Sequence, residues 1–123
     1  ACIPRSNRGK WIEEVKTAFE HLRAHLTKHM ALEEQDGYMS EVLARRPTLS
    51  PQVHLLEHEH HEFTQIMNLI HRSLAEIGPE DNLLIRDVCH RIQDLISYID
   101  HHKKSEDLLV ISVLTQDIGS SGD

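Results

Sequence analysis

The sequence predicts an all-α protein, an antiparallel bundle of three long helices that forms a single domain over residues 1–123. No segment alternates between apolar and polar residues with a period of two, whereas apolar residues recur at helical spacing along most of the chain. Prolines and glycines gather at a few points and divide the chain into three long segments. Long helices joined by short loops pack antiparallel as a bundle.

The first predicted helix runs from about Gly9 to Ala44, after an irregular leader over residues 1–8. Pro47 ends this segment, because proline lacks the amide hydrogen that a helix interior requires. Gly37 lies inside the segment, and a glycine there is able to end the helix early.

The second predicted helix begins at Ser50, which is suited to the N-cap and is followed by a proline suited to the first turn. It ends before Gly78, where a Gly-Pro pair interrupts the pattern. The third helix starts at residue 80 or 81 and runs to about Gln116. A flexible tail is expected over residues 118–123.

Composition argues against several classes of protein. Thirteen basic residues against 20 acidic ones give a net charge of −7, which disfavours nucleic acid as a partner. No apolar run approaches the roughly 18 residues of a membrane span, and no signal-peptide pattern opens the chain. Cys2 and Cys89 have no metal-like spacing and are interpreted as free thiols. We therefore expect a cytoplasmic protein with no membrane partner.

Histidine is the unusual component, with 11 among 123 residues. The histidines cluster in three segments, over residues 20–30, 53–63 and 100–104. Neutral imidazole is a common ligand for zinc, copper, nickel and iron. Their abundance predicts a metal site but does not identify the metal.

Five polar side chains interrupt the apolar stripes of the predicted helices. At about 100° per residue, these stripes contain His29 and Glu33 in the first helix, His60 in the second, and His102 and Glu106 in the third. Burying such groups costs several kcal/mol unless they are paired or coordinate a metal. Two carboxylates with several imidazoles are typical of a dinuclear iron or manganese site, whereas structural zinc more often recruits cysteine. We expect two carboxylate-bridged, non-haem iron ions, with manganese or zinc less favoured.

At these residues the sequence resembles the hemerythrin-like family, whose pattern has two halves. Each half is a lone histidine on one helix followed by His-x-x-x-Glu on the next. Here "HMALEE" supplies His29 and Glu33, "EHHEF" supplies His60, and "HHKKSEDL" supplies His102 and Glu106. The resemblance implies a four-helix bundle around a diiron centre.

The first helix of the family pattern has no counterpart here, because residues 1–8 are too few to form it and contain no histidine. We expect either that this helix was removed from a longer chain or that a second copy in a homodimer closes the bundle. His25, which lies one turn before His29, is a candidate for the missing nitrogen ligand.

The resemblance implies a metal site, but members of the family have different functions, so it does not identify one. We favour a module that reversibly binds or senses oxygen or nitric oxide. One alternative is a diiron protein that donates iron for cluster repair or reduces peroxide or nitric oxide, so enzymatic activity stays open. A second alternative is a structural helical bundle whose histidines have no metal role.

The other polar residues are interpreted as surface or packing positions. His71 lies near the face of His60 and is expected to be buried beside the site. Five histidines point away from the inward stripes and are expected in solvent, with His58 or His101 becoming a ligand only if its helix is rotated: His54, His58, His61, His90 and His101. Glu57, Glu59 and Asp107 are interpreted as surface charges rather than ligands. Asp107 stays an alternative to Glu106, because the resemblance includes a five-residue variant of the last pair. Tyr38 and Tyr98 have no obvious acid–base or radical role.

Overall fold

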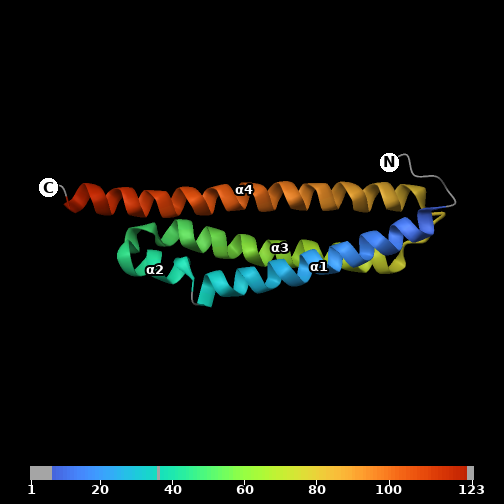
Figure 1. The fold of residues 1–123 in the computed structure, drawn as a ribbon, viewed down its shortest axis with the longest axis horizontal. Helices are drawn as coiled ribbons and strands as arrows, with labels where there is room; N and C mark the ends of the chain where they lie inside the picture. Colours follow the sequence, from blue (N-terminus) through green and yellow to red (C-terminus); the bar gives the residue numbers. More distant parts are fainter. Residues whose placement is uncertain (1–6, 36, 122–123) are drawn as a thin grey trace.

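The computed structural model describes residues 7–35 and 37–121, and nearly all of them are helical. The elements are α1 (Arg8–Gln35), α2 (Tyr38–Arg45), the 3-10 turn η2 (Pro47–Leu49), α3 (Ser50–Glu76) and α4 (Asn82–Ser121). The long helices α1, α3 and α4 run in alternating directions, as Figure 1 shows. The prediction of an all-α chain with three long helices is confirmed, while most of the predicted leader lies outside the described residues.

The first predicted helix is in fact two helices, because α1 ends at Gln35 and α2 begins at Tyr38. Glycine at position 37 explains the break. A Cβ atom there would lie 2.6 Å from the Cα of Glu33 and 2.7 Å from the carbonyl oxygen of Leu32. Only a residue without a side chain lets the backbone pass this close to the last turn of α1.

Replacing Gly37 by alanine is expected to lower the free energy of unfolding by about 1–3 kcal/mol, because backbone atoms must move to admit the new methyl group. Gly9→Ala is the matched control, since its nearest neighbour would be the Cγ atom of Pro79 at 3.8 Å, an ordinary contact. Gly9 lies inside α1, so alanine there should be neutral or stabilise by about 0.5–1 kcal/mol. Denaturant unfolding of the two variants measures the difference, and equal stabilities would contradict the steric argument.

The other helix boundaries differ from the predicted ones by a few residues. Ser50 is the first residue of α3 rather than its N-cap, because η2 precedes it directly and Leu49 occupies the cap. Between α3 and α4, the backbone N–H of Gly78 donates to Asp81 Oδ2 over 2.8 Å. Helix α4 starts at Asn82 and continues to Ser121, past the end expected near residue 116 and into the predicted tail.

The apolar core has two parts. The larger part lies between α1, α3 and α4 and includes Phe19, Met30, Phe63 and Leu95. The smaller part brings α2 against α3 and α4 and is formed by Met39, Val42, Val53, Leu56, Leu109 and Val113. The inward face of α3 is buried from Val53 to Leu74, whereas Leu84 near the start of α4 is 57% exposed.

The flank between α1 and α4 is open. Both helices pack against α3, but no described Cα atom of α1 lies within 8 Å of one of α4. A groove follows this flank near the start of both helices and is lined by Trp11 of α1 and by Ile85 and Cys89 of α4. Side chains of the two helices meet across it without the backbones coming close.

Candidate metal centre

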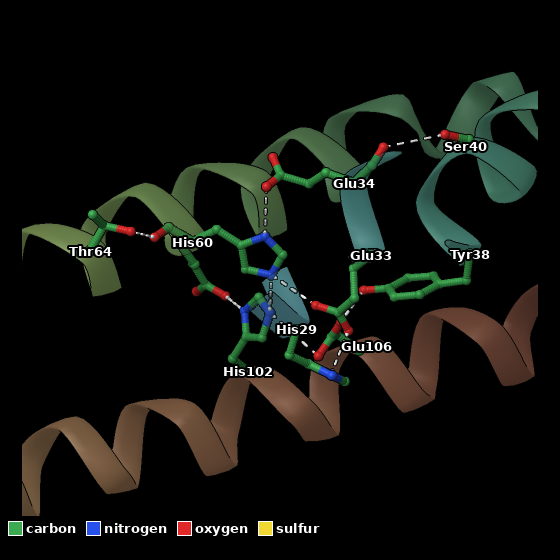
Figure 2. Close-up of polar contacts among 10 residues, drawn as sticks. His29, Glu33, Glu34, Tyr38, Ser40, His60, Thr64, His102 and Glu106 are labelled. Carbon is green, nitrogen blue, oxygen red and sulfur yellow. Dashed lines mark hydrogen bonds and ion pairs between the residues drawn. The ribbon is translucent and has the colours of Figure 1, made fainter. Parts of the chain in front are cut away.

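Four buried polar side chains meet where the two parts of the core adjoin. Glu33 comes from α1, His60 from α3, and His102 and Glu106 from α4, and none is more than 8% exposed. Each offers one ligand atom, and these four atoms lie within 4.8 Å of one another. Figure 2 shows the two imidazoles and the two carboxylates converging between the helices. The structure therefore brings together four of the six residues predicted to bind metal.

The spacing of the four groups suits a single ion. His60 Nε2 lies 3.1 Å from His102 Nε2 and 3.0 Å from Glu33 Oε1. His102 Nε2 lies 3.4 Å from Glu106 Oε1. Adjacent ligands on an ion with bonds of about 2.1 Å are separated by about 3.0–3.4 Å. These donor atoms could hold a metal ion with little rearrangement.

Two further carboxylates approach the Nδ1 atoms of the imidazoles, and one of them forms a hydrogen bond. His102 Nδ1 lies 2.7 Å from Glu59 Oε1, and His60 Nδ1 lies 3.3 Å from Glu34 Oε2 without the geometry of a hydrogen bond. A carboxylate at Nδ1 favours a proton on that nitrogen, which leaves the Nε2 lone pair facing the centre. Two lone pairs 3.1 Å apart repel each other unless a proton or a cation lies between them. The donor set thus fits a cation.

Glu59, interpreted from the sequence as a surface charge rather than a ligand, is partly buried and contacts His102. It lies about 100° from His60 on α3, but its side chain reaches across to α4, where it binds His102. The angular position was predictable from the sequence. The partner on another helix was not, because it depends on how α3 and α4 pack.

In the metal-free protein the four buried groups are paired with one another, which offsets part of the cost of burying them. Burial raises the pKa of Glu106, and the adjacent Glu33 adds to this effect, so that it reaches about 8. Burial also raises the pKa of Glu33, but the hydrogen bonds with His60 and Glu106 and the nearby His29 together outweigh burial and lower this pKa to about 2. Burial lowers the pKa of His102, whereas Glu33 and Glu34 overcome the same effect at His60 and raise its pKa. A proton held by the carboxylate pair therefore stabilises the metal-free cluster.

The stability of the metal-free protein is therefore expected to fall as the pH rises from about 5 to 9. A folded-state pKa of about 8 for Glu106, against the ordinary 4.5, stabilises the fold below pH 4.5, and this contribution is lost as the pH rises through 8. Glu106→Gln, which mimics the protonated acid, should remove most of this pH dependence. At pH 9 its free energy of unfolding should exceed that of the parent chain by an amount on the order of 2 kcal/mol. Below pH 4.5, protonation of Glu33 should destabilise both proteins.

Thermal unfolding of chelator-treated protein across this pH range tests the expectation. The matched control is Glu62→Gln, since Glu62 lies on the exposed side of α3 and pairs only with His58 among the described contacts. Parallel pH profiles for the parent chain and Glu106→Gln would show that the buried carboxyl group does not hold the proton.

The remaining two predicted ligands lie at the open side of this cluster. His29 is half-exposed, and its Nε2 atom lies 3.3 Å from Glu33 Oε2. His25 is exposed and stacks on His29, with ring centroids 6.4 Å apart. A cavity of about 120 Å³ between α1 and α4 is lined by His29 and Lys103 as well as by the buried cluster. His25 has no described contact with the four buried residues.

Two further assignments are settled by the tertiary contacts. His71 was expected to be buried, but its side chain is 45% exposed and pairs with Glu20 of α1. Tyr38, to which the sequence assigned no role, is half-buried and its hydroxyl group donates a hydrogen bond to Glu106 Oε2. The histidines predicted to be in solvent are all exposed: His54, His58, His61, His90 and His101.

Comparison of the chain with known proteins finds no matching family model, no matching curated protein and no matching solved structure. None of the described helices has an apolar stretch long enough to cross a membrane.

Proposed function

We propose that this chain is a non-haem diiron protein of the hemerythrin-like type, which binds or senses oxygen or nitric oxide. The observation that carries the proposal is the position of Glu33. One of its oxygens lies 3.0 Å from His60 Nε2, and the other lies 3.3 Å from His29 Nε2. A carboxylate with one oxygen directed toward each of two imidazoles is suited to bridge two metal ions.

The residues divide into two positions around this bridge. His60, His102, Glu33 and Glu106 would hold the first ion in the buried cluster. His29 would hold the second ion, with the other oxygen of Glu33, at the open side. Two carboxylates and three imidazoles suit iron or manganese better than a structural zinc site, which more often uses cysteine.

Iron in such a site supplies reversible redox chemistry and an affinity for small diatomic ligands. The chain's own contribution is to separate a buried position with four donors from a more open one. The Phe63 and His102 rings form a T-shaped contact, with centroids 5.1 Å apart, and Phe63 covers part of the inner position. The cavity of about 120 Å³ beside His29 has room for a small molecule but not for a large substrate.

The test is to load the reduced protein with iron without air, measure the iron content, and then add oxygen or nitric oxide. About two iron ions per chain, and an absorption change reversed by removing the gas, are expected. Consumption of the gas or of peroxide over many cycles would instead identify an enzyme. Stoichiometric zinc with no iron in protein from iron-replete cells would overturn the diiron assignment.

We further propose that two copies of the chain associate through the open flank between α1 and α4. Ile96 is 53% exposed and lies on the side of α4 that carries Ile85 and Cys89, which line the groove. This groove lies between the starts of two helices and has both apolar and polar lining residues, so a helix from a second copy fits it, and two-fold pairing lets each copy cover the other.

Light scattering at micromolar concentration is expected to show a dimer for the parent chain and a monomer for Ile96→Glu. Leu83→Glu is the control, because Leu83 is 77% exposed and lies on the opposite side of α4. A monomeric parent chain with full iron occupancy would contradict self-association.

A further inference from the structure

The carboxylate of Glu106 also divides its two oxygens between partners on opposite sides. Oε1 faces His102 Nε2 at 3.4 Å, and Oε2 accepts the hydrogen bond from the Tyr38 hydroxyl group. Glu33 repeats this arrangement between His60 and His29. The two carboxylates therefore stand between a pair of imidazoles on one side and an imidazole and a phenol on the other, as Figure 2 shows.

The placement of Tyr38 follows from the break in the first predicted helix. Gly37 brings the backbone close to Glu33 at the end of α1, and Tyr38 then begins α2. Helix α2 packs against α4, and Met39 and Val42 of α2 are buried in the smaller part of the core. Tyr38 packs beside them, so its ring is held in place while its hydroxyl group reaches the carboxylates.

The outer metal position needs a further ligand from the chain. His29 and one oxygen from each carboxylate supply three donors, which is fewer than iron normally takes from a protein site of this kind. His25 stacks on the outer side of the site and has no described contact with either carboxylate. Tyr38 is the remaining described side chain with an oxygen at hydrogen-bond distance from Glu106.

We propose that Tyr38 is a ligand of the outer iron ion, together with His29, Glu33 and Glu106. This inference rests on the diiron function proposed above. A phenolate oxygen is a hard, anionic donor of the kind that also ligates iron in haem catalases. On binding, the O–H bond of Tyr38 breaks, an iron–oxygen bond forms, and the proton leaves to water. The positive charge of the ion compensates the new charge on the phenolate.

The test uses the full chain loaded with iron(III). Coordination by a phenolate gives a charge-transfer band in the visible spectrum, and excitation in that band enhances tyrosine ring modes in the Raman spectrum. We expect both signals in the parent chain and in Tyr98→Phe, and neither in Tyr38→Phe. Tyr98 is the matched control because it is the other tyrosine of the chain and is 52% exposed on α4.

Metal content measured on the same samples separates the possible failures. We expect Tyr38→Phe to keep the first iron ion and to bind the second at least about tenfold more weakly. Two iron ions per parent chain without the phenolate signals would overturn the role of Tyr38 and leave the diiron function standing. Absence of bound iron would overturn both. Ring-deuterated tyrosine, which should shift the Raman bands of the parent chain, tests the assignment even if Tyr38→Phe does not fold.

Discussion

Replacing His60 or Glu106 by alanine is expected to abolish stoichiometric iron binding. Each contributes a donor atom to the buried group, and each is less than 5% exposed, so water cannot easily take its place. Removing one ligand also leaves its neighbours with an unpaired lone pair or charge in a dry environment. Titration of the metal-free protein with iron(II) in the absence of air, followed by elemental analysis after gel filtration, measures the loss.

The same experiment should show a graded response at the surrounding positions. Glu59→Ala is expected to weaken binding by about 10–100-fold, because it removes the carboxylate that orients His102. His61→Ala and His90→Ala should leave binding unchanged, since both side chains are exposed. If all of these variants lost iron equally, the division between inward and outward faces would be wrong.

Metal binding is expected to raise the melting temperature of the protein by about 12–20 °C. The four ligand atoms meet only in the folded chain, since they come from three helices, so a metal ion binds the folded state almost exclusively. At a free concentration about 1,000 times the Kd, such binding stabilises the fold by about 4 kcal/mol. For a chain of 123 residues, each kcal/mol shifts the melting temperature by about 3–5 °C.

Circular dichroism of the chelator-treated protein, heated with and without added iron(II), measures this shift. Glu106→Gln is the control, because it keeps the shape of the side chain but lacks the carboxylate, and it should show little response to metal. A melting temperature that does not depend on metal would favour the structural alternative, in which protons alone stabilise the cluster.

The sequence alone predicted the helical fold and the residues that face inward. Both depend on local periodicity, because side chains three or four residues apart share one face of a helix wherever that helix packs. His60 and Phe63 on α3, and His102 and Glu106 on α4, are buried as their stripes predicted. Glu33 is also buried, on the stripe of α1 that it shares with Leu26.

Only the tertiary structure decided which residues surround the inward ones. Glu59 orients His102 from a different helix. Tyr38 reaches Glu106 because the helix is interrupted at Gly37. These contacts join residues far apart in the sequence, and they depend on how the helices cross and how closely two backbones approach. Periodicity along one helix contains no information about either quantity. The same reason explains why His29, on the predicted stripe, stays half-exposed at the open flank between α1 and α4.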